Sequence, residues 1–253
     1  RVTVMPGVPP MLAAWAGRGP GERDLSALRL AASGAAPLDP AVAERFAAAF
    51  GVPVWEGYGL TETAPVLTTT AMGEQPRYGS VGRPLPDVEL RLVGERDTPV
   101  RRGDPGEVLA RGPNVFAGYW RDPERTRRAF TPEGFFRTRD IGYADAEGNL
   151  RLVDRKGDLI IVSGFNVYPR EVEDVLIRHH AVAAAAAVGV PHERTGEAVV
   201  AHVVLRPGAE ATPEELIAHS RTLLARFKCP REIVLRDELP TAPTGKLMRR
   251  RLR

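Results

Sequence analysis

Lys246 ends a loop whose shape is restricted by proline and glycine. Residues 241–246 read Thr-Ala-Pro-Thr-Gly-Lys and lead into a basic tail. A lysine ammonium is a compact positive charge, which suits a carboxylate or phosphate oxygen whose own charge changes during a reaction. Lys246 is therefore a candidate catalytic residue, and a solvated lysine on the basic tail is the alternative.

A second polar segment, residues 56–62 (Glu-Gly-Tyr-Gly-Leu-Thr-Glu), follows a short apolar run, and we expect it to form a loop. The hydroxyl of Thr61 can bind a phosphate oxygen, and Glu62 offers the hard oxygen ligand that Mg²⁺ prefers. Tyr58 can stack on a base. An ordinary glycine-rich turn with a Thr-Glu helix cap is the alternative explanation.

Small residues follow two apolar runs in the first half of the chain. Gly57 and Gly59 would let the backbone approach a ligand closely. Residues 33–37 (Ser-Gly-Ala-Ala-Pro) would give an adenine ring a flat surface. For residues 33–37 alone, a strand-to-helix turn is the simpler explanation.

Asp140 ends a Phe-Arg-Thr-Arg-Asp run, just before a stretch that we predict to be a strand. Its carboxylate can accept both vicinal hydroxyls of a ribose, as an acidic residue does in dinucleotide sites. A surface cluster of salt bridges explains the same run without a ligand.

Helices and strands alternate in the part of the chain that must position these segments. Asp39 and Pro40 predict the start of a helix, and Gly51 predicts its end. We expect strands at residues 2–5, 28–32, 52–55, 88–92, 107–110 and 150–153, and helices at residues 40–50 and 123–130.

The charged, glycine-containing break at residues 154–158 (Asp-Arg-Lys-Gly-Asp) separates two apolar strands, so we place a domain boundary there, with domains at residues 1–154 and 155–253. Residues 181–188 are nearly all alanine, which favours a helix by propensity but a strand by position. The second domain is α+β, with strands at residues 159–162, 198–205 and 233–235 and helices at residues 169–178 and from 212 onward.

Composition is that of a globular protein: 43% of the residues are hydrophobic and 26% are charged. The single cysteine, Cys229, allows no internal disulfide, which fits a cytoplasmic location. No apolar run reaches the roughly 18–20 residues of a spanning helix. The chain begins at Arg1 directly on a strand-like stretch, and we interpret this as truncation.

The tail, residues 249–253 (Arg-Arg-Arg-Leu-Arg), is expected to be a solvated face. Nucleic acid is not an expected partner, because no aromatic residues are interleaved with these charges. A weak peripheral contact with an anionic membrane is left open. His179 and His180 are expected as cations at a helix C-terminus, and a core position is expected for Trp15, Trp55 and Trp120.

In their order along the whole chain, these segments resemble the motifs of the adenylate-forming superfamily, which includes acyl-CoA synthetases, nonribosomal adenylation domains and luciferases. Residues 58–62 look like its Y-G-x-T-E motif, and residues 137–140 like its R-T-G-D motif. Residues 154–158 resemble its inter-domain hinge, and residues 243–246 its catalytic-lysine motif. The fold implied is α/β plus α+β: the C-terminal part of the large AMP-binding domain, then a small mobile domain in which the alanine stretch is a strand.

The resemblance also implies roles for individual residues. Thr61 would bind the α-phosphate, Glu62 the Mg²⁺, and Asp140 the ribose. Lys246 would bridge the substrate carboxylate and the α-phosphate, which makes Lys246, Thr61 and Glu62 the catalytic group. The residues implied to contact ATP or AMP are Gly34, Ala35, Glu56, Gly57, Tyr58, Thr61, Asp140, Arg155 and Lys246.

Residues 162–169 are similar to a loop of fatty-acyl-CoA ligases, in which a glycine at the position of Gly164 leaves room for the pantetheine arm of coenzyme A. Ser163 and Phe165 would bind coenzyme A beside it. The family's small domain rotates about the hinge, here Lys156 and Gly157, after adenylation. The lysine then leaves the site and the Gly164 loop enters it.

The expected function is an ATP-dependent acid–CoA ligase for a fatty acid, with ATP, Mg²⁺, coenzyme A and a carboxylic acid as its small molecules. One alternative is an enzyme that adenylates an aryl or other carboxylate and loads CoA or a carrier protein. Another is a non-catalytic fragment or nucleotide-binding module. Neither the acid nor the oligomeric state follows from the sequence.

Departures from the family pattern qualify this expectation. The Ser/Thr/Gly-rich phosphate loop is absent, so we expect the chain to be inactive alone. Arg139 stands where the family has glycine, which either shifts the backbone at Asp140 or adds surface charge. Gly157 stands at a hinge position that is usually Lys or Asp, and it predicts a looser hinge.

Overall fold

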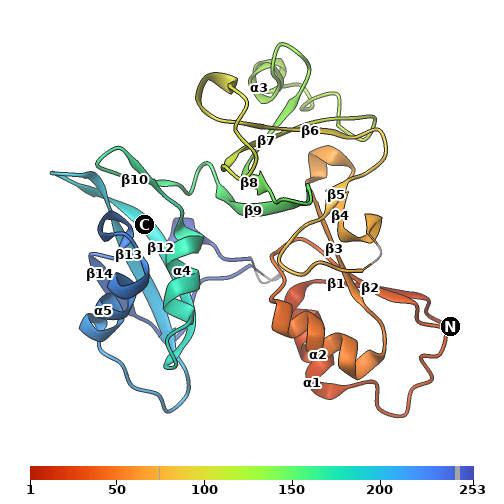
Figure 1. Ribbon diagram of the computed structural model, residues 1–253, viewed down its shortest axis with the longest axis horizontal. Coiled ribbons are helices and arrows are strands. Elements are labelled where there is room, and N and C mark those ends of the chain that lie inside the picture. The colour runs from red at the N-terminus through yellow and green to blue at the C-terminus, as the bar shows by residue number, and fades with distance from the viewer. Residues whose placement is uncertain (74, 243–245) are drawn as a thin grey trace. The chain divides into compact units, whose positions relative to one another are not determined.

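The computed structural model describes residues 1–73, 75–242 and 246–253, and it divides into two compact units, Arg1–Leu152 and Val153–Arg253 (Figure 1). The division lies next to the charged break at residues 154–158. Residues 243–245 of the lysine motif lie outside the described residues.

The first unit contains a five-stranded mixed sheet in the order β1-β2-β3-β4-β5. Its strands are β1 (Val4–Gly7), β2 (Leu30–Ser33), β3 (Val54–Gly59), β4 (Val66–Thr69) and β5 (Arg83–Pro84). The first three are parallel, and β4 and β5 pair antiparallel. Helices α1 (Pro9–Arg18) and α2 (Pro40–Phe50) connect the parallel strands. This alternation confirms the predicted α/β class.

Helix α2 has the predicted ends. The Asp39 side chain accepts a hydrogen bond from the amide of Ala41 at 2.8 Å, and Gly51 takes the left-handed conformation after the last turn. These groups satisfy the first amides and terminate the helix. Leu12 of α1 and Phe46 of α2 pack in one cluster with Val54 of β3, so both helices cover the same face of the sheet.

A second sheet completes the first unit in the order β6-β7-β8-β9. Its strands are β6 (Glu89–Val93), β7 (Gly106–Arg111), β8 (Phe136–Ala144) and β9 (Leu150–Arg155), and α3 (Pro123–Ala129) lies between β7 and β8 in the chain. Short 3₁₀ turns are η1 (Thr61–Thr63), η2 (Thr70–Met72) and η3 (Glu95–Asp97). The two sheets share a core, because Tyr58 and Leu67 pack with Val88 and Val108.

The second unit is a sheet in the order β11-β10-β13-β12, with β14 parallel to β13. Its strands are β10 (Ile160–Val162), β11 (Phe165–Val167), β12 (Val182–His192), β13 (Gly196–Leu205) and β14 (Glu232–Leu235). Its helices are α4 (Pro169–Ile177) and α5 (Pro213–Leu223), with 3₁₀ turns η4 (Arg226–Lys228) and η5 (Arg249–Arg251). The capping box of Thr212 and Glu215 forms as predicted.

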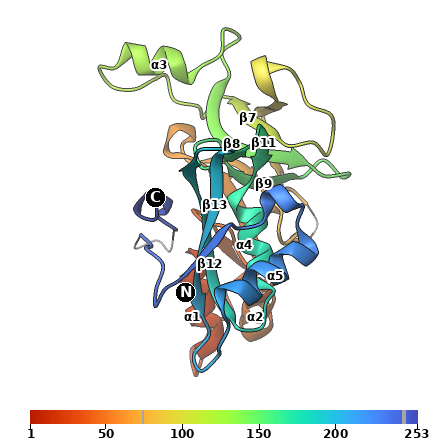
Figure 2. The ribbon, with the colours of Figure 1, turned by 90° about the vertical axis from the view of Figure 1, so that its left-hand side faces the viewer.

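The alanine stretch is strand β12, which resolves the conflict between its propensity and its position. Ala185 and Ala187 pack in the cluster that contains α4 and α5, whereas Ala186 and Val188 pack with Leu252 of the tail. Figure 2 shows the tail and the two helices on opposite sides of this sheet. Small residues suit a strand that is covered on both faces, and such burial overrides helix propensity.

Three minor predictions are wrong. Trp120 is 85% exposed rather than in the core. Helix α4 ends before His179, and burial, followed by the charges of His180 and His219, lowers the pKa of His179, which opposes a cationic role. Arg249 of the tail is mostly buried against Glu173.

In the described part of the chain, no helix is long and apolar enough to cross a membrane.

Candidate active site

Strands β2 and β3 bring the predicted adenine-binding residues together at their C-terminal ends. Ser33 is in register with Glu56, and a side chain at Gly34 would lie 3.5 Å from the carbonyl oxygen of Gly57. Glu56 and Gly57 therefore lie within β3, so the prediction of a loop from residue 56 is wrong. In open α/β sheets, ligands bind at this end of parallel strands.

The glycines of this segment differ in what they allow. At Gly57, a Cβ would make only ordinary van der Waals contacts. At Gly59, a Cβ would overlap the backbone of Pro65. Gly59 is therefore required by the close approach of its own chain, a cause that sequence reasoning did not separate from ligand binding. Ala35, after β2, is exposed and has a left-handed backbone with φ of 70°.

Tyr58 and Asp140, 82 positions apart in sequence, form a buried hydrogen bond. The Tyr58 hydroxyl donates to Oδ2 of Asp140 at 2.7 Å, and the two residues are 7% and 6% exposed. The Tyr58 ring belongs to the core cluster that joins the two sheets, which leaves little of its face for a base to stack on. The bond fixes the position of the Asp140 carboxylate, as the predicted role of accepting two ribose hydroxyls would require.

Asp140 lies inside β8 rather than before a strand, at an irregularity where residues 138–140 oppose Val108 of β7. The Thr138 hydroxyl donates to the carbonyl of Val108 at 2.8 Å and accepts from the amide of Asp140 at 3.1 Å. Arg139 has φ of 62°, a left-handed value that favours glycine. The backbone thus keeps a conformation suited to the family's glycine, and Arg139 occupies it at an energetic cost.

Arg137, in the same run, supports the salt-bridge explanation. Its guanidinium contacts Asp97 at 2.5 Å and lies 3.9 Å from Glu107. The hydrogen bonds that Arg137 donates to Asp97 raise the pKa of Arg137. The run therefore makes two kinds of contact: Arg137 pairs with Asp97 and Glu107, and Asp140 accepts a hydrogen bond from Tyr58.

The turn η1 carries Thr61 and Glu62. Thr61 is exposed, and Glu62 is half-buried. The Tyr119 hydroxyl donates to Oε1 of Glu62 at 3.0 Å, and burial, then this bond, raises the pKa of Tyr119. A single oriented carboxylate fits Mg²⁺, which commonly binds one or two carboxylates together with substrate phosphates. Among the described residues, no cluster of three or more His, Cys, Asp or Glu forms a complete metal cage.

The segment after β7 holds η1 in place, and sequence reasoning missed it. Asn114 Nδ2 donates to the carbonyls of Thr63 and Val66 at 2.9 and 2.7 Å, and the Phe116 amide donates to the carbonyl of Glu62 at 2.9 Å. Asn114 and Tyr119 lie between 48 and 57 positions from the residues they hold. No local pattern in the sequence could have indicated these contacts.

In the second unit, Ser163 and Gly164 form the two-residue turn between β10 and β11. Their φ values are 51° and 83°, the signs that a type I′ hairpin turn requires. Strand β11, which sequence analysis did not predict, begins at Phe165. Phe165 is 56% exposed and stacks on Phe227 at a centroid distance of 4.7 Å. Gly164 thus has a conformational reason for being glycine besides the predicted contact with coenzyme A.

The predicted hinge residues Lys156 and Gly157 follow β9, which ends at Arg155, a predicted nucleotide contact. The Asp154 carboxylate accepts from the amides of Arg155 at 2.8 Å and Arg170 at 3.0 Å, which ties this segment to the start of α4. Gly157 does not have a left-handed backbone, and a Cβ there would meet nothing within 4 Å. A lysine would therefore fit, so the greater mobility expected of Gly157 is not enforced by space.

Lys246 is exposed at the base of its turn. Its carbonyl accepts from the Ala242 amide at 2.8 Å, and Thr241 forms a bridge with Leu247. The turn's base is therefore ordered by backbone pairing. Lys246, Gly164 and Arg155 belong to the second unit, and the residues from Gly34 to Asp140 belong to the first.

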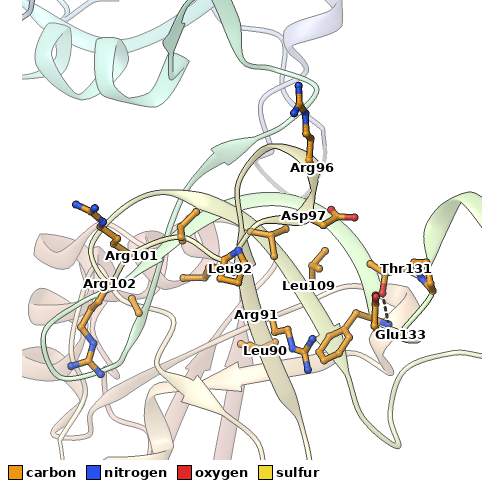
Figure 3. A pocket seen from close by; sticks show the side chains of 16 residues that line it. Leu90, Arg91, Leu92, Arg96, Asp97, Arg101, Arg102, Leu109, Thr131 and Glu133 are labelled. Atoms are coloured by element: carbon orange, nitrogen blue, oxygen red, sulfur yellow. Dashed lines mark hydrogen bonds between the residues drawn. The ribbon is translucent and has the colours of Figure 1, made fainter.

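A depression of about 720 Å³ lies elsewhere in the first unit, over β6 and β7 and beside residues 131–135 (Figure 3). None of the predicted site residues lines it. Its arginines do not converge, because Arg101 and Arg102 point outward from one side and Arg96 points away from the cavity. Strand ends and turns therefore position the residues that are predicted to contact the nucleotide, and this depression does not contribute to their site.

Comparison with known proteins agrees with the motifs. The model of the AMP-binding enzyme family matches residues 1–120, and that of the AMP-binding enzyme C-terminal domain matches residues 171–246. The two models together cover most of the chain, and they follow the order of the two units. The chain belongs to the AMP-binding enzyme family, which is the adenylate-forming class that the motifs indicate.

Particular relatives narrow the likeness. The chain is 44% identical over 230 residues to a long-chain-fatty-acid–CoA ligase of Yersinia pestis, covering 91% of this chain and 41% of that protein. ATP-bound MatB from Rhodopseudomonas palustris is similar in structure, with a TM-score of 0.90 and 37% identity over 100% of this chain and 50% of that one. An o-succinylbenzoate CoA synthetase from Bacillus subtilis, in complex with its acyl-adenylate intermediate, has a TM-score of 0.83, 32% identity and coverage of 100% and 51%.

Proposed function

We propose that this chain carries the second part of an ATP-dependent acid–CoA ligase that acts on a fatty acid. An acyl-adenylate forms first from the carboxylic acid and ATP, and coenzyme A then takes the acyl group as a thioester. The chain spans about two fifths of the length of the fatty-acid ligase it resembles. Its activity is therefore proposed for the full-length enzyme, and we expect residues 1–253 alone to be inactive.

The observation that carries this proposal is the buried bond between Tyr58 and Asp140, since it joins two family motifs across the two sheets. An ionised carboxylate held at a fixed place can accept the 2′- and 3′-hydroxyls of AMP. Gly34 and Gly57 lie side by side at the ends of β2 and β3, where an adenine ring can approach the backbone. The likeness to ATP-bound MatB supports ATP as the nucleotide.

Thr61 would donate its hydroxyl to the α-phosphate, and Glu62 would hold Mg²⁺ by the carboxylate that Tyr119 orients. The ion would neutralise phosphate charge and so aid the departure of pyrophosphate. Lys246 would place its ammonium between the acid's carboxylate and the α-phosphate, where negative charge moves from one to the other. Arg155 would reach the ribose or phosphate.

For the second step, the turn of Ser163 and Gly164 would admit the pantetheine thiol, with Phe165 beside it. A rotation about Lys156 and Gly157 would exchange Lys246 for this turn. Such an exchange lets one small domain serve two half-reactions in sequence.

A second candidate within the same class is a ligase for an aryl or other carboxylate, supported by the likeness to o-succinylbenzoate CoA synthetase. A carrier protein also presents a pantetheine thiol, so the turn at Gly164 is compatible with that acceptor too. A non-catalytic nucleotide-binding module is the alternative outside enzymes. A cytoplasmic location and a weak membrane contact through the exposed Arg250 and Arg251 belong to the same proposal.

The test is ATP–pyrophosphate exchange by the full-length protein with acids of varied chain length and aromatic acids, followed by thioester formation with coenzyme A or a carrier protein. We expect exchange to be strongest with fatty acids. Exchange with no acid would contradict adenylation. The coding region upstream of Arg1 gives an earlier check, because a natural gene without a phosphate loop could not support full catalysis.

A further inference from the structure

The tail that follows Lys246 is fastened to the sheet of the second unit. Leu252 is buried with Ala186 and Val188 of β12, and Leu247 packs against the same cluster. The Met248 amide donates to the carbonyl of Pro240 at 2.8 Å, next to the bond between Ala242 and Lys246. The chain on both sides of Lys246 is thus held, although Lys246 itself is exposed.

Within this tail, Arg249 reaches a buried acid. Its Nη2 donates to Oε1 and Oε2 of Glu173 at 2.8 and 2.7 Å, and its Nε donates to Oε1 at 3.2 Å. Glu173 lies on α4 and is 7% exposed, and its Oε1 also accepts from the Ala187 amide of β12 at 2.8 Å. Burial raises the pKa of the Glu173 carboxyl, and the charge of Arg249 opposes that rise. One carboxylate therefore joins the helix, the edge strand and the tail.

Arg249 also connects the tail with the segment predicted to be the hinge. Asp158 lies 3.7 Å from Nη1 of Arg249 and 4.0 Å from Nη2 of Arg253. Arg253 further donates to the carbonyl of Gly157 at 3.4 Å. The tail is thus bound at three places: the apolar cluster, Glu173 and residues 157–158.

The neighbouring arginines show that this arrangement is specific to particular positions. Arg250 and Arg251 are exposed, and neither makes an ion pair with any residue that the structure describes. A positive charge on the tail is therefore not sufficient for an ion pair with Glu173. Arg249 is held because its planar guanidinium forms several hydrogen bonds with the buried Glu173 carboxylate.

We propose that Glu173 is a positioning residue for Lys246: through Arg249 it fixes the tail, and thereby the base of the turn that carries the lysine. This inference rests on the proposed role of Lys246 in adenylation. Because Lys246 is exposed, the position of its ammonium depends on how firmly the neighbouring backbone is held. Displacement of such a group by about 1 Å can cost on the order of 100-fold in rate.

The test is Glu173→Gln in the full-length enzyme, because glutamine keeps the shape and an acceptor for the Ala187 amide but removes the charge that Arg249 needs. We expect pyrophosphate exchange to fall at least tenfold in kcat, with a small change in KM for ATP. Thioester formation from supplied acyl-adenylate should stay within about twofold of the wild type. The matched control is Arg250→Gln, which should leave both steps unchanged.

Arg249→Lys keeps the positive charge but cannot form the paired hydrogen bonds, so it should give an intermediate loss and serves if Glu173→Gln does not fold. Hydrogen exchange supplies a second readout that is independent of catalysis. The amides of Ala242 and Met248 should exchange faster in both variants than in Arg250→Gln.

Different outcomes would overturn different claims. Equal losses in both half-reactions, or a lower Tm with normal adenylation, would make Glu173 a structural residue only. Failure of the proposed function is seen separately, as absence of exchange in the wild type or normal exchange in Lys246→Ala. In either case the positioning role falls with it.

Discussion

The two units of this protein hold their candidate functional groups in opposite ways. In the first, Asp140 and Tyr58 are buried, bonded to each other and built into adjoining sheets. In the second, Gly164 and Lys246 are exposed, and backbone pairing holds the residues beside them.

This difference matches the tasks proposed for the two sets. A nucleotide that stays bound through both half-reactions needs one fixed arrangement, which a sheet core provides at low conformational cost. Groups that act in only one half-reaction must be presented and withdrawn, and a turn can do so if its base is firmly anchored. On this basis, we expect the buried groups to serve binding and stability, and the groups on turns to serve single steps.

The largest effect is expected for Lys246→Ala in the full-length enzyme. Loss of a charge aimed at developing negative charge should lower acyl-adenylate formation by about 100- to 1,000-fold. Thioester formation from supplied acyl-adenylate should be largely spared. Pyrophosphate exchange and single-turnover thioester assays measure the two steps. Equal losses in both would show that Lys246 is structural.

Substitutions of Gly164 separate space from conformation. Gly164→Ala should lower both stability and the thioester rate, since alanine disfavours the left-handed turn. Gly164→Asn tolerates that turn and should restore stability. If the thiol arm needs the space, the asparagine variant should still form thioester roughly tenfold more slowly, the equivalent of about 1.4 kcal/mol. A normal thioester rate in Gly164→Asn would assign the glycine to the turn alone.

Tyr58→Phe removes the donor to Asp140 and tests the buried half of the comparison. We expect the free energy of unfolding to fall by about 1.5–3 kcal/mol, the range for hydrogen bonds to charged groups. We also expect the KM for ATP to rise. Urea unfolding and steady-state kinetics measure these effects. Tyr143→Phe, on the same strand β8, is the control, since the Tyr143 hydroxyl has no partner among the described residues. Similar losses in both variants would deny the bond a special role.

Arg139→Gly should stabilise the first unit by about 1 kcal/mol, because it relieves a left-handed backbone in a residue with a Cβ. Arg139→Ala keeps that strain and should give no comparable gain. The midpoint of urea unfolding reports the difference between the two variants. A gain in Arg139→Ala equal to that in Arg139→Gly would point to surface charge instead of backbone conformation.

The smallest expected effect is a pH dependence at His202. Arg236 donates to its Nδ1 at 3.0 Å, so Nε2 carries the proton and donates to the carbonyl of Leu252 at 3.2 Å. Burial, then the charge of Arg236, lowers the pKa of His202; the bond to Leu252 and the charge of Glu232 oppose this. A lowered pKa means that the stability contributed by neutral His202 is present above its ordinary value and is lost as pH falls through the folded value.

Between pH 7.5 and 5, the Tm of the wild type should therefore fall by roughly 2–4 °C more than that of His202→Gln. Thermal unfolding across this range measures the difference. His180→Gln, an exposed histidine of the same unit, should behave like the wild type. Parallel curves for the wild type and His202→Gln would contradict the prediction.

Local sequence signals predicted the elements well where the cause is local. The cap at Asp39 and the capping box at Thr212 lie where expected, because each depends on neighbours along the chain. The limits of β3 and β8 were misplaced, because pairing with other strands extends them through Glu56 and Asp140. Predicting strand β12 required knowing that other residues cover both of its faces, and the alanine content of the segment does not reveal this.

For the candidate site, the sequence predicted only which motifs are present and their order along the chain. Sequence motifs indicated Tyr58, Asp140 and Lys246, but not that the first two would meet at 2.7 Å. Tyr119 and Asn114, which hold η1, and Glu173, which holds Arg249, act across long separations. Such partners become visible only when the chain is folded.

The irregularity at Arg139 bears on how protein families are recognised. The letter G in a four-letter signature stands here for a dihedral angle, and the chain supplies that angle with another amino acid. A pattern search that demands the letter would reject this chain, although the carboxylate that follows is in place. Signatures written as allowed backbone conformations would retain such members. They would also mark each non-glycine residue at a left-handed position as a site where a single substitution can raise stability.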